Sequence, residues 1–181
     1  RRADRGEVTD LHFHHFHSEG PAPYSAPEYE GIFFDQGFFI GPNVRANVNA
    51  GYADYLPVHL GETPKLYRSG AIKLEAALVN ISLPDENGMV SLGTSVDCSP
   101  AAIECARIVI GVVNPNVPYS YGESIPLSEF DYLVQDDEPL VTAHFAEPTE
   151  LEVQIGKNCA SLIDDGDCLQ MGIGALPNAL A

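Results

Sequence analysis

The sequence of 181 residues is poor in positive charge. It has 9 lysine and arginine residues against 26 aspartate and glutamate residues, which gives a formal net charge of −17. A surface of this kind repels the phosphates of nucleic acids and anionic lipid headgroups. We therefore expect neither a nucleic acid nor a membrane among the partners of this chain. An anionic small ligand needs a local pocket built from backbone N–H groups and a few cations.

Long apolar runs and paired cysteines are also missing. No segment approaches the roughly 18 consecutive apolar residues of a membrane span. The four cysteines, Cys98, Cys105, Cys159 and Cys168, form no CxxC pair and no pattern of a disulfide-rich scaffold. This usage predicts reduced, mostly buried thiols in a cytoplasmic protein. Hydrophobic residues make up 45% of the chain, which is enough for a sizeable core.

Apolar runs of strand length alternate with short helical patterns along the chain. Strands are predicted within 11–17, 32–41, 54–62, 75–83, 108–114 and 130–139, and helices within 42–52, 62–70, 99–108 and 151–164. Asn87-Gly88 is a strong tight-turn signal and predicts a hairpin. The alternation predicts an α/β fold with an open, largely parallel sheet and flanking helices. We expect residues 1–10 to be a frayed polar segment and residues 11–181 to form one domain.

The sequence ends on CLQMGIGALPNALA (168–181), an apolar run followed by two glycines and a proline. This order predicts a strand, a glycine turn and the start of a helix. Gly172 and Gly174 allow a ligand to approach the backbone, and Pro177 suits the first helical turn, whose N–H groups attract negative charge. Pro177 stands where a dinucleotide fingerprint has its third glycine. The motif alone leaves open a structural turn, an anion or cofactor loop, and a dinucleotide site.

Four histidines gather in the predicted strand 11–17 and suggest a metal site at first sight. Side chains alternate along a strand, so His15 and His17 share one face while His12 and His14 share the other. Two histidines per face, with no cysteine nearby, favour an ordinary strand over a zinc site. We expect no metal centre here.

Cys98 and Cys105 lie seven residues apart, on one face of the predicted helix 99–108. This spacing favours a core face. A nucleophilic cysteine needs a cationic partner, and only His59 and His144 lie outside the histidine-rich strand. We therefore expect no catalytic cysteine.

Two acidic runs and one arginine complete the set of candidates. The runs at 135–139 and 164–167 lack the ligand spacing of a calcium loop and predict solvated turns. Arg45 is one of only nine cations, and its guanidinium suits either a carboxylate or phosphate ligand or a structural ion pair. Both interpretations of Arg45 stay open.

Five longer segments carry a resemblance to a known family. They are GPAPYSAPEYEGIF (20–33), FIGPNVRANVNAGYADYLPVHLGETPKL (39–66), LVNISLPDENGMVSLGTSVDC (78–98), DYLVQDDEPL (131–140) and IGKNCASLIDDGDCLQMGIGALPNAL (155–180). Together they resemble the acetyl-CoA hydrolase/CoA-transferase family, in particular its 4-hydroxybutyrate CoA-transferases and butyryl-CoA:acetate CoA-transferases. The match covers nearly the whole chain from about Leu11, and the motifs keep their order.

The resemblance implies a fold, a ligand and a reaction. Family members have two similar open α/β domains with the active site between them. The loop that matches Gly172, Ile173, Gly174, Ala175 and Leu176 binds coenzyme A, which is a substrate rather than a permanent cofactor. A glutamate carboxylate attacks the acyl-CoA thioester and forms an anhydride, and the released thiolate then gives a glutamyl-CoA thioester. An acceptor carboxylate such as acetate, butyrate or 4-hydroxybutyrate finally takes the coenzyme A.

The nucleophile itself has no match in this chain. In the family, the glutamate follows the GIGALP helix in a segment resembling H-x-E-M, so we expect it beyond Ala181. Glu86 and Glu104 match other family positions, and no catalytic residue is assigned here. The resemblance thus predicts an N-terminal domain truncated at both ends, inactive alone, whose partner is the missing C-terminal half. Family members commonly self-associate, so a homo-oligomer is possible.

Alternative functions also stay open. An acetyl-CoA hydrolase of the same family would resolve the glutamyl thioester with water instead of a carboxylate. A nucleotide-binding oxidoreductase module would use the glycines of the terminal motif for a dinucleotide. A non-catalytic interaction domain would use the acidic surface.

Overall fold

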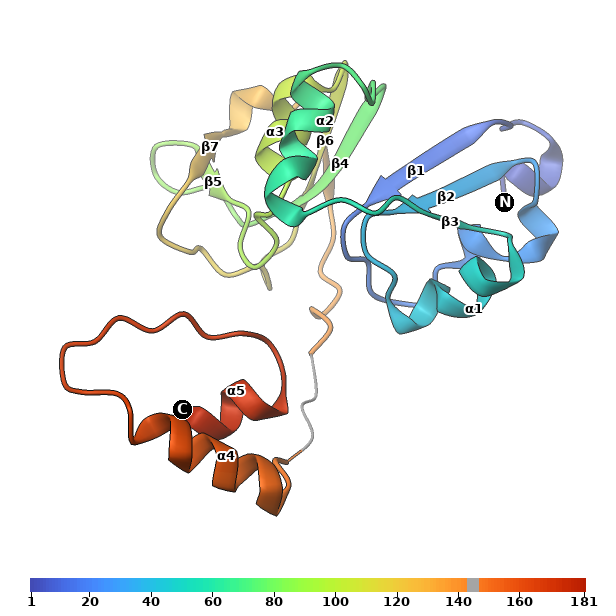
Figure 1. Cartoon of the computed structure of the whole chain (residues 1–181). Helices are drawn as coiled ribbons and strands as arrows, with labels where there is room; N and C mark the ends of the chain where they lie inside the picture. Colours follow the sequence, from blue (N-terminus) through green and yellow to red (C-terminus); the bar gives the residue numbers. More distant parts are fainter. Residues whose placement is uncertain (143–146) are drawn as a thin grey trace. The chain divides into compact units, whose positions relative to one another are not determined.

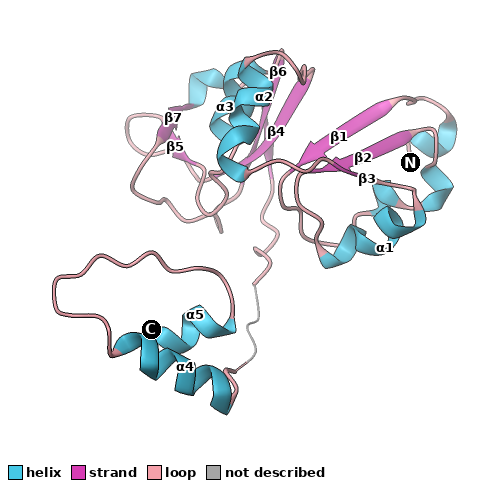
Figure 2. Cartoon of the chain, in the orientation of Figure 1, coloured by secondary structure: helices cyan, strands magenta, loops and turns pink. Residues whose placement is uncertain are grey.

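The structure is a computed structural model that describes residues 1–142 and 147–181. It consists of two compact units, residues 1–141 and residues 142–181. Figure 1 shows the course of the chain through both units, and Figure 2 shows that all strands belong to the first one. The units are described separately below. The domain boundaries expected from the sequence stay predictions.

The first unit begins with a parallel sheet of three strands in the order β1-β2-β3. Its strands are β1 (Leu11–His15), β2 (Phe33–Gly37) and β3 (Asp54–Tyr55), with the 3-10 turns η1 (Ala3–Arg5), η2 (Pro23–Ser25) and η3 (Pro27–Tyr29) before β2. Helix α1 (Pro42–Ala50) connects β2 to β3. Pro42 opens this helix and Gly51, at φ 86°, ends it, as the sequence predicts.

A second parallel sheet follows, in the order β4-β6-β8. It contains β4 (Ala76–Ile81), β6 (Ile108–Val113) and β8 (Tyr132–Gln135), and is accompanied by η4 (Leu60–Glu62), α2 (Thr63–Arg68), α3 (Ser99–Cys105) and η5 (Leu127–Glu129). The predicted α/β class with parallel strands and flanking helices is confirmed. The parallel strands are divided between two sheets, a division that strand patterns do not encode.

The main core lies on one face of this second sheet. It consists of Ala77, Val79, Ile81, Val90, Leu92, Ile103, Val109, Ile125 and Phe130. The apolar run 75–83 predicts a strand that is buried on both sides. In the structure, β4 alternates between buried and exposed residues, and Leu78 is 70% exposed. A second cluster of Phe38, Tyr67, Cys98 and Ala101 packs the end of β2 against α2 and α3.

The predicted turn at Asn87-Gly88 is present, with Gly88 at φ 73°. The Asp85 carboxylate accepts the N–H groups of Asn87 and Met89 at 2.9 and 2.8 Å. The strand after the turn, β5 (Met89–Ser91), pairs antiparallel with β7 (Ser124–Pro126) and not with β4. Two backbone hydrogen bonds of a hairpin are present across the turn, from Ser82 N–H to Ser91 and from Asp85 N–H to Met89, both at 2.9 Å. The predicted pair of adjacent strands does not form, and the strand ladder of β5 is made with β7.

The second unit contains α4 (Glu150–Ala160) and α5 (Ala175–Leu180), which pack against each other. Thr149 starts α4 with a capping box, in which its hydroxyl and backbone exchange hydrogen bonds with Glu152. The strand predicted at 168–171 is wrong: this segment is irregular and exposed. A strand needs a hydrogen-bonded neighbour, and none of the residues described in this unit forms one. No helix in the described ranges is long and apolar enough to cross a bilayer.

Candidate functional site

The predicted coenzyme A loop, residues 172–176, leads into α5 in the second unit. Gly174 precedes the helix, and Pro177 lies in the first helical turn, as the sequence predicts. Ile173 is 94% exposed, so its side chain extends into solvent. Ile173 therefore adds no packing to its own unit, whereas the Leu176 side chain is only 40% exposed.

The two glycines of the loop are glycine for different reasons. Gly174 has φ 140°, a backbone conformation that residues other than glycine rarely adopt. Gly172 has no such conformation, and a Cβ on it would make only an ordinary contact of 3.5 Å with Pro177. The second unit thus requires a glycine at 174, whereas the space beside Gly172 is open to a ligand.

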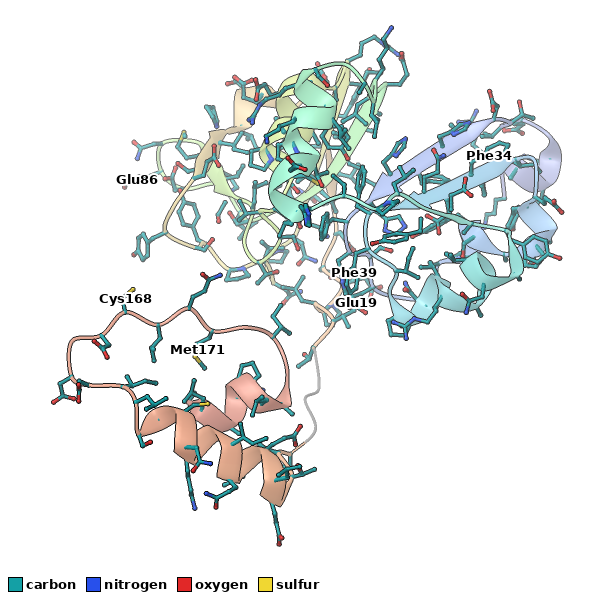
Figure 3. All side chains as sticks on the ribbon, viewed as in Figure 1. Glu19, Phe34, Phe39, Glu86, Cys168 and Met171 are labelled. Carbon is teal, nitrogen blue, oxygen red and sulfur yellow. The ribbon has the colours of Figure 1, made fainter. Side chains whose placement is uncertain are left out.

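A pocket of about 220 Å³ lies beside this loop. Its lining residues come from both helices and the segment between them: Gly156, Cys159, Gln170, Met171, Gly172, Leu176, Pro177 and Leu180. Figure 3 shows the Met171 side chain pointing from the connecting segment toward the helices, whereas Cys168 points to the other side. Of the predicted site residues, Gly172 and Leu176 line the pocket, and Ile173, Gly174 and Ala175 do not.

Gly156 makes the packing of the two helices possible. A Cβ at this position would lie 2.4 Å from the carbonyl oxygen of Ala179 and 3.2 Å from the backbone nitrogen of Leu180. Only glycine leaves room for the α5 backbone at this crossing. Sequence reasoning missed Gly156, although a glycine inside the predicted helix 151–164 is a signal of close packing.

A larger groove of about 460 Å³ lies in the first unit, at the carboxyl ends of β4, β6 and β8. It is lined by Leu83, Val113, Pro115, Gln135, Asp136 and Asp137. The Asn114 and Asn116 side chains donate to the backbone carbonyls of Glu138 and Asp137 at 2.8 and 2.9 Å, which ties the loops after β6 and β8 together. Open parallel sheets bind ligands at this edge. The sequence predicted the acidic turn at 135–139 but not the groove that this turn lines.

The histidines of β1 make separate contacts and do not converge. His15 Nε2 lies 2.7 Å from the buried carboxylate of Asp35 on β2. His12 Nδ1 lies 3.1 Å from Gln36, on the other face of the strand. Burial, with added repulsion from His12 and His15, lowers the pKa of His14. Within residues 1–142 and 147–181, no three His, Cys, Asp or Glu side chains are arranged to hold a metal ion.

Cys98 belongs to the core cluster around Tyr67, and Cys105 packs against it, which confirms the predicted core face. Burial raises the pKa of the Cys98 thiol to about 12, and nearby Asp97 adds to this effect. Such a thiol is not a nucleophile at neutral pH. His59 is exposed, and His144 lies outside the described residues.

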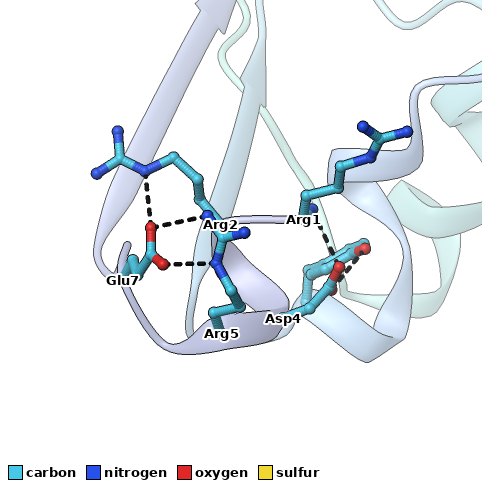
Figure 4. Close-up of polar contacts among 6 residues, drawn as sticks. Arg1, Arg2, Asp4, Arg5 and Glu7 are labelled. Atoms are coloured by element: carbon cyan, nitrogen blue, oxygen red, sulfur yellow. Dashed lines mark hydrogen bonds and ion pairs between the residues drawn. The ribbon is translucent and has the colours of Figure 1, made fainter.

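Few cations are available for an anionic ligand. At the N-terminus, Arg2 and Arg5 both pair with Glu7 (Figure 4). Arg45 is exposed and donates to the backbone carbonyl of Ile40 at 3.3 Å, and it has no carboxylate partner among the residues described. The ion-pair interpretation of Arg45 is therefore not supported. The two acidic runs are mostly exposed turns, as predicted.

Comparison with known proteins decides the family. Residues 4–143 match the family described as the acetyl-CoA hydrolase/transferase N-terminal domain. The chain belongs to this family. The resemblance found in the sequence segments is thus confirmed, and membership of an enzyme family replaces the oxidoreductase interpretation.

Two curated members of the acetyl-CoA hydrolase/transferase family show how much of a member this chain covers. It is 38% identical over 167 residues to the 4-hydroxybutyrate coenzyme A transferase of Clostridium kluyveri. The alignment covers 92% of this chain and 39% of the relative. It is also 38% identical over 175 residues to the succinyl-CoA:acetate/propanoyl-CoA:succinate CoA transferase of Fasciola hepatica. That alignment covers 96% of this chain and 36% of the relative. The chain therefore spans less than half the length of these relatives.

Solved structures of similar proteins agree with the fold. The 4-hydroxybutyrate CoA-transferase of Porphyromonas gingivalis matches with a TM-score of 0.78 and 35% identity, over 98% of this chain and 41% of its own. RipA from Yersinia pestis matches with a TM-score of 0.86 and 29% identity, over 98% of this chain and 44% of the RipA chain. The fold of this chain thus matches one part of each of these longer chains.

Proposed function

We propose that the protein containing this chain transfers coenzyme A between a short-chain acyl-CoA and a carboxylate acceptor. Acetate, butyrate and 4-hydroxybutyrate are the acceptors expected from the resemblance. Family membership and the names of the relatives support the reaction. The hydrolase alternative has no better support, because the curated relatives are named as transferases.

The candidate loop, residues 172–176, contacts coenzyme A in this proposal. One observation about Gly172 supports this role of the loop. Gly172 lines the pocket, yet neither its backbone conformation nor its surroundings require a glycine. Backbone N–H groups in such a loop suit a thioester carbonyl that becomes negatively charged when it is attacked. The same groups would serve a hydrolase.

The attacking glutamate is proposed to lie outside these 181 residues. No aspartate or glutamate lines the pocket beside the loop. The chain alone is therefore expected to bind coenzyme A without transferring it. All four cysteines are free thiols, which supports the cytoplasmic location, although the expectation of mostly buried thiols is wrong because Cys159 and Cys168 are exposed. Self-association, which the resemblance implies, is part of the same proposal.

Gly172→Ala tests the role of the loop. The added methyl group makes only an ordinary contact within the protein, so the circular dichroism spectrum should not change. We expect the affinity of the 181-residue chain for coenzyme A to fall about tenfold, which corresponds to a steric conflict of about 1.4 kcal/mol with the ligand. Titration calorimetry measures both affinities.

Gly61→Ala is the matched control. Gly61 also has open space around a Cβ, but it lies in the first unit, outside the candidate loop. This variant should bind coenzyme A like the unaltered chain. Equal affinity of the Gly172→Ala variant, or no binding by the unaltered chain, would contradict the proposed role of the loop.

A further inference from the structure

The pocket beside the candidate loop is almost free of polar side chains. Met171, Leu176, Pro177 and Leu180 provide apolar walls, and Gln170 and the Cys159 thiol are the polar groups. None of the lining residues is an aspartate, glutamate, lysine, arginine or histidine. In a chain with a net charge of −17, an uncharged pocket of about 220 Å³ selects its ligand by apolar contact.

This lining discriminates between parts of an acyl-CoA. The adenosine end carries phosphates and the pantetheine arm carries amides, so both lose hydration in an apolar pocket without gaining partners. The acyl chain is the one portion that is wholly aliphatic. Each methylene buried against these side chains adds favourable free energy.

The loop and the pocket share Gly172 and Leu176. A ligand bound to the loop therefore lies directly beside the pocket. In the proposed function the loop contacts the thioester carbonyl, so the thioester is the part of the ligand nearest the loop. The acyl chain next to that carbonyl is then the portion closest to the pocket.

We propose that this pocket holds the uncharged aliphatic chain of a short acyl-CoA, of butyryl size, and excludes acyl groups that end in a carboxylate. The proposal rests on the proposed function, because it needs coenzyme A to bind at the loop. It adds the class of acyl group, which neither the loop nor the family specifies. A terminal carboxylate in this pocket would be desolvated, and none of the residues that line the pocket carries a positive charge.

Two stable thioethers provide matched probes, since neither can acylate a thiol. S-butyl-CoA has the aliphatic chain, and S-(3-carboxypropyl)-CoA has a chain of similar length that ends in a carboxylate. Calorimetry on the 181-residue chain should show that S-butyl-CoA binds about tenfold more tightly than coenzyme A. The carboxypropyl analogue should bind no more tightly than coenzyme A.

Cysteine alkylation then reports where the chain binds. Cys159 is exposed and lines the pocket, whereas Cys168 is exposed and does not. At about ten times its Kd, S-butyl-CoA should slow iodoacetamide labelling of Cys159 about tenfold, because about nine-tenths of the molecules are then occupied. Labelling of Cys168, followed in the same peptide digest, should not change.

Each other outcome has a defined meaning. Equal protection of Cys159 by coenzyme A and S-butyl-CoA would overturn the acyl assignment and leave coenzyme A binding intact. Binding of S-butyl-CoA without protection of Cys159 would place the acyl chain elsewhere, with the same consequence. Failure of all three ligands to bind would overturn the proposed function, and this proposal with it.

A pair of variants tests the apolar wall independently. Met171→Gln keeps the length of the side chain and makes the wall polar, so the preference for S-butyl-CoA over coenzyme A should fall to near unity. Leu162→Gln is the control, because Leu162 is 83% exposed and does not line the pocket. An unchanged preference in the Met171→Gln variant would contradict the proposal.

Discussion

Replacing Gly156 with alanine should separate the two helices of the second unit. A Cβ at this position would lie 2.4 Å from the carbonyl oxygen of Ala179 and 2.8 Å from its carbonyl carbon. Both atoms belong to the backbone, so no side-chain rotation relieves the contact. Helix α5 must move away from α4, or α4 must bend.

The expected loss follows from two opposing effects. Overpacking of a tight contact costs about 1–3 kcal/mol. In the opposite direction, alanine stabilises a helix interior by about 1 kcal/mol relative to glycine. Since the contact at Gly156 involves backbone and is far shorter than ordinary Cβ contacts, we expect a net loss of about 1.4 kcal/mol, or a factor of ten in the opening equilibrium.

Hydrogen exchange followed by mass spectrometry measures this opening in the 181-residue chain. Amides of α5 should exchange about tenfold faster in the Gly156→Ala variant, while peptides from residues 1–141 keep their rates. Gly61→Ala is again the control, since its Cβ meets nothing within 4 Å. Unchanged or slower exchange of α5 in the Gly156→Ala variant would refute the packing described for the second unit.

Two further predictions concern ionisable groups of the first unit. Because burial raises the pKa of Cys98 to about 12, iodoacetamide at pH 8 should label Cys168 but not Cys98 in the native chain; equal labelling in a peptide map would contradict the burial. Hydrogen bonds from the backbone of Met89 and then of Asn87 lower the pKa of Asp85 below the ordinary value of 3.8 for an aspartate. The charged carboxylate therefore stabilises the folded state above that pH. The Asp85→Asn variant should therefore unfold at lower urea concentration at neutral pH, and the difference should shrink as the pH falls below 3.8; a difference independent of pH would argue against this turn.

Local sequence signals predicted the parts of the fold that depend on neighbours in the chain. Pro42 and Gly51 bound α1, and Gly88 turns the chain before β5, because each acts on its own backbone angles. The core face of Cys98 was also predictable from helical spacing. These features need no knowledge of distant residues.

Signals that depend on distant partners were less reliable. The apolar segment 168–171 reads as a strand, yet it forms none in a unit whose described residues offer no strand to pair with. The turn at Asn87-Gly88 predicted a hairpin, but β5 pairs with β7 across more than thirty residues of chain. Hydrogen bonds between strands are made with whichever edge the fold brings near, and residue order does not state which edge that is.

The sequence by itself determined the family and the position of the glycine turn before the last helix, because these depend on residue types in a fixed order. The role of residues 172–176 in binding coenzyme A stays a prediction. Only the tertiary structure showed that Gly156, Cys159 and Met171 surround this loop and that the resulting pocket is uncharged. The physical reason is the crossing of α4 and α5. Their backbones approach closely at one glycine, and a contact between residues this far apart in the chain exists only once the helices have packed.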